Sequence, residues 1–280
     1  MSALIQILKS IVFGVVEGIT EWLPISSTGH LILLNAVIPL TDNAEFWDMY
    51  KYIIQLGAIL AVVVLYWHKL WPFSKTKTAQ ETKDIWGIWL RIVIASVPTG
   101  IVGVLLNDYV DAHLSTPMVV AVALIVYGIF FLLIERAPRK AKIKSISAID
   151  AKTALLIGAA QSLAVIPGTS RSGSTILGAL LLGLSRGTAA EFSFFLAIPV
   201  MFGVSLLELI RHATAVSLVE IVVLLVGMVV SFLVSVLVIR SLMSYIRKHN
   251  FRAFGLYRIV LGALILILAV LGVLPAAIKA

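Results

Sequence analysis

Two things are scarce in this chain of 280 residues, namely cysteine and charge. Cysteine is absent, which excludes disulfide bonds and thiolate metal sites. Charged residues make up only 13% of the chain, against roughly 25% in a typical globular domain, whereas hydrophobic residues make up 60%. The sequence also has neither an HExxH zinc motif nor a GxxxxGK[ST] phosphate-binding loop. These absences argue against a soluble enzyme and predict a polytopic helical membrane protein.

The apolar runs of the chain fall into two length classes. Runs 3–16 and 31–40 are too short to span a bilayer and flank a polar turn at 17–30, and a similar pair flanks a turn at 167–175. Because irregular backbone at membrane depth must be covered by protein or line a water-filled cavity, we predict that each pair forms a re-entrant hairpin. Six longer runs are predicted spans, at about 52–68, 88–107, 118–135, 189–210, 218–239 and 255–274.

The two halves of the chain repeat the same order of elements. Residues 14–17 (GVVE) align with 158–161 (GAAQ), and a one-residue gap then aligns the two polar turns. Each half would hold one hairpin and three spans, and because three is odd, the second copy must enter the bilayer inverted. We therefore predict a single all-α membrane domain over 1–280, with a first inverted repeat at 1–140 and a second at 141–280.

Basic residues gather in three alternate loops, at 69–83, 136–144 and 240–252. The positive-inside rule places these loops in the cytoplasm, so the formal net charge of +8 reflects membrane topology and predicts no nucleic-acid partner. With this orientation the first hairpin dips in from outside and the second from inside. The sequence thus predicts that the two polar turns meet near the middle of the membrane.

The first turn carries two acids, three hydroxyls and an imidazole. Glu17 and Glu21 are four residues apart, so a helix places both carboxylates on one face, where they share a proton or hold Mg²⁺ or Ca²⁺. His30 follows Ser27 by three residues and could bond it, as proton transfer or activation of a nucleophile requires. The hydroxyls of this turn either cap the following helix or contact a ligand, and they belong to Ser26, Ser27 and Thr28.

The second turn is centred on Arg171, the only formal charge between Lys152 and Arg186. An arginine at membrane depth needs an anionic partner, which is either a carboxylate of the first turn or a ligand phosphate. Glycines and hydroxyls around a guanidinium at a helix start are typical of a phosphate cradle. The candidate cradle residues are Gly168, Thr169, Ser170, Ser172, Ser174 and Thr175.

Both turns resemble motifs of one family. Residues 17–31, EGITEWLPISSTGHL, and 167–175, PGTSRSGST, resemble the two motifs of the undecaprenyl-diphosphate phosphatases of bacterial inner membranes, the bacitracin-resistance type, with Trp22 where phenylalanine is common. The resemblance implies interlocked inverted repeats, an outward-facing site, a divalent cation, and hydrolysis of a C55 polyprenyl diphosphate to its monophosphate. The family's functional residues fall on Glu17, Glu21, Ser27, His30 and Arg171.

Two functions are compatible with these residues. In a phosphoanhydride hydrolase, Arg171 and the hydroxyls of the second turn hold the diphosphate, and the two glutamates hold the cation or provide a base. Ser27 activated by His30 is the first choice of nucleophile, with direct attack by His30 or by a water activated by Glu21 as alternatives. The rival function is a carrier of phosphate or polyprenyl phosphate. The expected partners are the lipid substrate and membrane lipid, with a homodimer left open.

Overall fold

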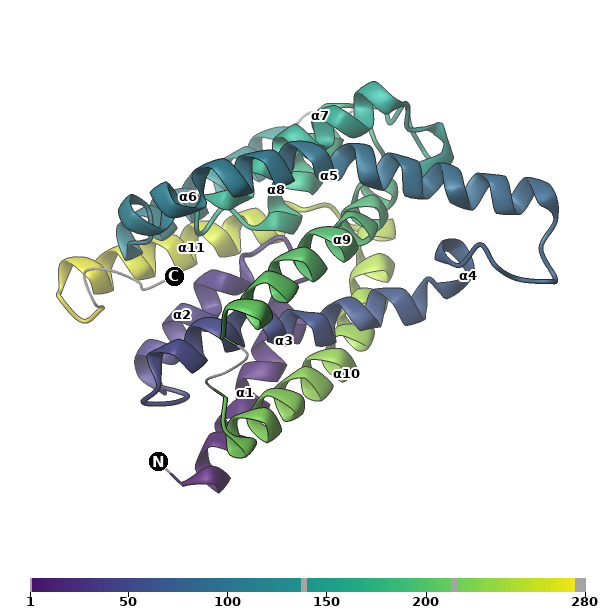
Figure 1. Ribbon diagram of the computed structural model, residues 1–280. Coiled ribbons are helices and arrows are strands. Elements are labelled where there is room, and N and C mark those ends of the chain that lie inside the picture. The colour runs from purple at the N-terminus through teal and green to yellow at the C-terminus, as the bar shows by residue number, and fades with distance from the viewer. Residues whose placement is uncertain (1, 137–139, 213–215, 275–280) are drawn as a thin grey trace.

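The computed structural model describes residues 2–136, 140–212 and 216–274. Within these ranges the chain is helical and contains no β-strand, only an isolated bridge between Ile143 and Leu184, which confirms the all-α prediction (Figure 1). The elements are α1 Ala3–Thr20, α2 Ser27–Val37, α3 Ala44–Leu65, α4 Trp67–Leu70, α5 Ala79–His113, α6 Pro117–Ile134, η1 Ile146–Ala148, α7 Ala151–Ser162, η2 Leu163–Val165, α8 Arg171–Leu181, α9 Arg186–His212, α10 Leu218–Lys248 and α11 Arg252–Val270.

Seven of the described helices are long and apolar enough to cross a bilayer, so the chain is a multi-pass membrane protein. Six of them, α3, α5, α6, α9, α10 and α11, correspond to the predicted spans. The seventh is α1, which we had predicted to be a short run interrupted at Glu17. That prediction is wrong, because α1 includes Glu17, whose side chain is buried, and continues without interruption to Thr20.

Two pairs of helices, α1 with α2 and α7 with α8, are interrupted by the polar turns. Each turn ends at a serine with positive φ, 74° at Ser26 and 70° at Ser170. Each serine caps its helix, because its side chain accepts the backbone N–H of Gly29 or Gly173, at 3.3 and 3.1 Å. Ser26 and Ser170 lie 144 positions apart, and so do the aligned residues Glu17 and Gln161. The alignment of the two halves therefore needs no gap between the end of the first helix and the capping serine.

The two halves of the chain exchange contacts in equivalent ways. The first helix of each half packs against a long helix of the other half, α1 against α10 and α7 against α5, while α6 packs against α11 (Figure 1). Gly14 and Gly158, aligned in the sequence, make the first two contacts, because a Cβ on either one would collide with the backbone of the opposing helix. This exchange is the pattern that interlocked inverted repeats predict, and the boundary between residues 140 and 141 stays a prediction.

The base-rich loops lie at one end of the helix bundle. Glu135, at the end of α6, forms an ion pair with Arg186 at the start of α9 and accepts the N–H of Phe251 before α11. Lys69, after α3, forms an ion pair with Glu191 on α9 at 2.6 Å. Residues 137–139 of the middle loop lie outside the described residues. These contacts gather the three loops on one side, as the positive-inside argument requires.

Candidate functional site between the two turns

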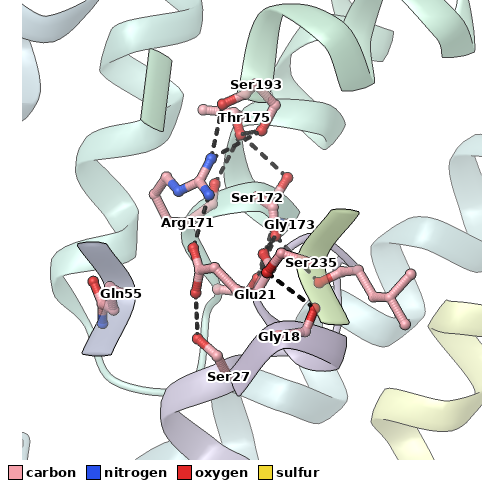
Figure 2. Close-up of polar contacts among 12 residues, drawn as sticks. Gly18, Glu21, Ser27, Gln55, Arg171, Ser172, Gly173, Thr175, Ser193 and Ser235 are labelled. Carbon is pink, nitrogen blue, oxygen red and sulfur yellow. Dashed lines mark hydrogen bonds and ion pairs between the residues drawn. The ribbon is translucent and has the colours of Figure 1, made fainter. Parts of the chain in front are cut away.

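The two turns meet through Glu21, which follows the last residue of α1. One carboxylate oxygen accepts a hydrogen bond from Arg171 of the second turn at 2.7 Å. The other accepts a hydrogen bond from the hydroxyl of Ser27 at 2.5 Å. Figure 2 shows the three side chains in line, with Glu21 between the other two. The prediction that Arg171 has an anionic partner is confirmed, and that partner joins both turns.

The guanidinium of Arg171 is held on several sides. Its Nη1 donates to the backbone oxygen of Ser193 on α9 at 2.8 Å, and its Cζ lies 5.5 Å from the ring centre of Trp22. The hydroxyl of Thr175 bonds that of Ser193 at 2.6 Å and supports this contact (Figure 2). The Nε of Arg171 is buried and has no hydrogen-bond partner within the described part of the chain. One donor of a fixed guanidinium is therefore free for a ligand oxygen.

Glu17 lies one helical turn before Glu21 and is fully buried. Both of its carboxylate oxygens lack a hydrogen-bond partner among the described residues. A buried carboxylate with no partner is costly, and it is satisfied by a proton or by a cation. The described residues contain no group of three or more potential metal-ligating His, Asp or Glu side chains. Glu17 and Glu21 could therefore supply at most two carboxylates to a hard cation, and both oxygens of Glu21 already accept hydrogen bonds.

The remaining hydroxyls of the second turn point in different directions. Ser172 donates to the backbone oxygens of Glu21 and Leu23, at 3.1 and 3.2 Å, and so ties the two turns together. Thr169 donates within its own turn, to the backbone oxygens of Leu163 and Ile166. Ser170 caps α8, and Ser174 faces an apolar cavity beside α8. The predicted cradle is thus partly a set of structural contacts that hold the turn around Arg171.

Two predicted residues of the first turn do not gather at Glu21. Thr28 is exposed, and His30 does not bond Ser27, contrary to our expectation. His30 Nδ1 lies 2.7 Å from the backbone oxygen of Ser26, which can only accept, so Nδ1 carries the proton. In the neutral imidazole, Nε2 then accepts a hydrogen bond from the hydroxyl of Tyr257 at 2.6 Å. The rings of His30 and Tyr257 are also stacked. Residues three apart on a helix share a face, so it is these two contacts, to Ser26 and to Tyr257, that direct the imidazole towards α11 and away from Ser27.

Arg258 is a component of the site that the sequence reasoning missed. Its side chain is fully buried on α11, and its guanidinium donates to backbone oxygens of both turns. The distances are 3.1 Å to Pro24 and 2.9 Å each to Gly168 and Thr169. It is the only formal charge in the predicted span 255–274, and a charge inside an apolar span is a signal that would have identified it.

The fold and the site define a class: a multi-pass membrane protein in which two interrupted helix pairs enclose a carboxylate, a hydroxyl and a guanidinium. Comparison with known proteins identifies the family. The profile of the family described as bacitracin resistance protein BacA matches residues 10–264, and this chain belongs to that family. The chain is similar to undecaprenyl-diphosphatases of Enterococcus faecalis, 52% identical over 94% of this chain and 97% of the relative, and of Acetivibrio thermocellus, 51% identical over 94% and 98%. An undecaprenyl-diphosphatase 1 of Oenococcus oeni is 48% identical over 96% and 98%.

Proposed function

We propose that this chain hydrolyses undecaprenyl diphosphate to undecaprenyl phosphate and inorganic phosphate. The observation that carries the proposal is the line of Ser27, Glu21 and Arg171 across the two turns. It places a hydroxyl, a carboxylate that can accept its proton and a fixed guanidinium within one site, in which Glu21 and Ser27 are buried. Catalysis of phosphoryl transfer depends mainly on such positioning and charge stabilisation. The names and high identity of the relatives support hydrolysis over the carrier function.

The geometry favours Glu21, rather than His30, as the acceptor of the Ser27 proton. In the proposed step, Ser27 Oγ forms a bond to the terminal phosphorus as its proton passes to Glu21. The bond from that phosphorus to the bridging oxygen breaks, and its electron pair leaves with undecaprenyl phosphate. Water then cleaves the phosphoserine, giving inorganic phosphate and restoring the Ser27 hydroxyl. Arg171 stabilises the charge that develops on the phosphoryl oxygens.

Glu17 and Glu21 are the residues that would hold a divalent cation. When bound, Mg²⁺ or Ca²⁺ supplies positive charge against the diphosphate oxygens. The unpartnered oxygens of Glu17 support this assignment, because cation binding satisfies both the buried carboxylate and the phosphate. Glu17 and Glu21 would hold the cation, and Glu21 also contacts Ser27 and Arg171.

We place the protein in a bacterial inner membrane, with the base-rich end in the cytoplasm and the site open to the outside. This orientation supports access to lipid diphosphate in the outer leaflet. A homodimer remains a prediction, which sedimentation of the purified protein in detergent tests.

Phosphate release from undecaprenyl diphosphate, measured with purified protein with and without EDTA, tests the function. Release that stops on chelation and in Ser27→Ala is the expected result. Ser96→Ala is the control, because that hydroxyl donates only within its own helix, to Ile92. A trapped phosphoserine distinguishes attack by Ser27 from attack by water or by His30. If folded wild-type protein released no phosphate, the hydrolase proposal would be wrong and transport into liposomes would be measured next.

A further inference from the structure

A half-open cavity of about 330 Å³ lies among α6, α7 and α8, and the site described above does not use it. Its lining is almost entirely apolar and includes Phe130 and Leu133 on α6, Ala160 on α7 and Leu177 on α8. Phe130 and Leu133 are about half exposed, at 48% and 49%, so the cavity opens towards the lipid-facing surface. We refer to it as the α8 groove.

The α8 groove shares its helix with the candidate phosphate site. Arg171 is the first residue of α8, Ser174 lies one turn further on, and Leu181 is the last residue. Of these, Ser174 and Leu181 line the groove, which also reaches Ile134 at the end of α6. The groove therefore starts beside the first turn of α8 and follows the helix to its end. Arg171 itself does not line the groove, and Ser174, three residues further along α8, is the lining residue nearest to it in the sequence.

Ser174 and Tyr127 are the lining residues that carry hydroxyls, and Ser174 lies at the end of the groove nearest the second turn. It is 2% exposed, and its hydroxyl has no hydrogen-bond partner within the described residues. A buried hydroxyl without a partner is unfavourable, and a ligand oxygen at this position would satisfy it. In a prenyl diphosphate, the ester oxygen that joins the chain to the first phosphate is an acceptor at the junction of head and chain. Ser174 occupies the corresponding junction between site and groove.

We propose that the α8 groove binds the first isoprene units of the prenyl chain, with Ser174 donating a hydrogen bond to the ester oxygen. The inference rests on the proposed function and adds to it the position of the chain. A volume of about 330 Å³ is at the lower end of ligand pockets and holds only the start of a C55 chain. The rest leaves past Leu181, which is 58% exposed.

The direction of the groove agrees with the orientation that we proposed for the protein. Ile134 and Leu181 lie at its far end and precede the base-rich segments, where Glu135 pairs with Arg186. A chain in the groove therefore points from the site towards the cytoplasmic side. A lipid of the outer leaflet has the same polarity, with its head outward and its chain inward.

The test compares substrates of increasing chain length in two matched variants. Ala160→Leu adds bulk inside the groove, whereas Ala159→Leu makes the same change at the next, exposed position, which does not line it. Phosphate release is measured with dimethylallyl diphosphate (C5), farnesyl diphosphate (C15) and undecaprenyl diphosphate. In Ala160→Leu we expect KM for the C15 substrate to rise about tenfold and KM for C5 to rise much less, because a single isoprene unit fills little of the groove. Ala159→Leu should match the wild type.

Equal changes in KM for C5 and C15, or equal behaviour of the two leucine variants, would overturn the inference. Since Ala160 lies close to Gly178 and leucine could disturb the packing of α7 on α8, Phe130→Ala provides a second test. That change removes a wall without adding bulk, and it should raise KM for C15 more than for C5. Identical KM values in Phe130→Ala and wild type would also contradict the inference. No release from any substrate by wild type would instead contradict the proposed function itself.

Discussion

The two polar turns share a backbone but differ in chemistry. In each, a serine with positive φ caps the next helix. The helix before each turn, α1 or α7, packs against a helix from the other half of the chain. At the position after the cap, the first turn has Ser27 and the second has Arg171. The duplicated scaffold thus presents a hydroxyl from one side and a guanidinium from the other, and Glu21 contacts both.

The helices that precede the turns differ in the same way. Glu17 of α1 aligns with Gln161 of α7, and both are buried. Gln161 donates to the hydroxyl of Thr99 on α5 at 2.9 Å, whereas Glu17 has no partner among the described residues. The first turn therefore carries the carboxylates, and the second carries the guanidinium. Neither turn has both kinds of charged group, so the site depends on the meeting of the two.

Removing the donor of the second turn should have the largest effect. Arg171→Ala is expected to lower kcat/KM for phosphate release by about a thousandfold or more, because both charge stabilisation and the partner of Glu21 are lost. Arg171→Lys should recover only part of the activity, since an ammonium cannot reproduce the planar contacts with Glu21 and Ser193.

The control for this change is Arg186→Ala, which removes another arginine–glutamate pair at the far end of the bundle. We expect it to retain most of the wild-type kcat/KM. Robust hydrolysis by folded Arg171→Ala would show that the second turn does not hold the diphosphate.

Exchanging the acid and the amide between the halves tests their division of roles. Glu17→Gln gives the first half the residue of the second, and it should raise the Mg²⁺ concentration for half-maximal activity about tenfold or more, because an amide is a weaker cation ligand. The reciprocal change, Gln161→Glu, should leave that concentration unaltered. The measurement is a titration of activity with Mg²⁺ after removal of bound cations by EDTA. An unchanged titration in Glu17→Gln would remove Glu17 from the proposed cation site.

Arg258 connects the two turns, and its removal should separate them. Arg258→Met leaves three backbone oxygens, those of Pro24, Gly168 and Thr169, without their donor. We expect a loss of about 3 kcal/mol of stability, seen as a lower midpoint of thermal unfolding in detergent. Arg252→Met, at the start of the same helix and exposed, is the control. Equal midpoints for the two variants would show that the contacts of Arg258 contribute little.

The smallest effect is expected at Tyr257. Tyr257→Phe removes the donor to Nε2 of His30 and leaves the stacked ring in place, so kcat/KM should fall by about three- to tenfold. Tyr109→Phe is a matched control, because Tyr109 also stacks on a histidine, His113. If Tyr257→Phe and Tyr109→Phe had the same activity, the position of His30 would not depend on the Tyr257 hydroxyl.

Much of this arrangement follows from local sequence. Apolar runs predict the helices, and the cost of a charge at membrane depth predicts a partner for Arg171, which is Glu21. Local pattern does not predict where α1 ends, because the burial of Glu17 against other helices decides whether the helix continues. The spacing of Ser27 and His30 suggested a direct bond, but the backbone oxygen of Ser26 and the hydroxyl of Tyr257 on α11 hold His30 elsewhere.

The contacts of Arg258 have a consequence for the order in which the protein is made. Arg258 lies on α11, the last described helix of the chain, and it holds backbone from residues 24 and 168–169. During synthesis, both polar turns leave the ribosome long before the residue that joins them. A nascent chain that ends before α11 therefore contains Glu21, Ser27 and Arg171 without the guanidinium that holds their turns together. Full assembly of the site is thus tied to the synthesis of α11.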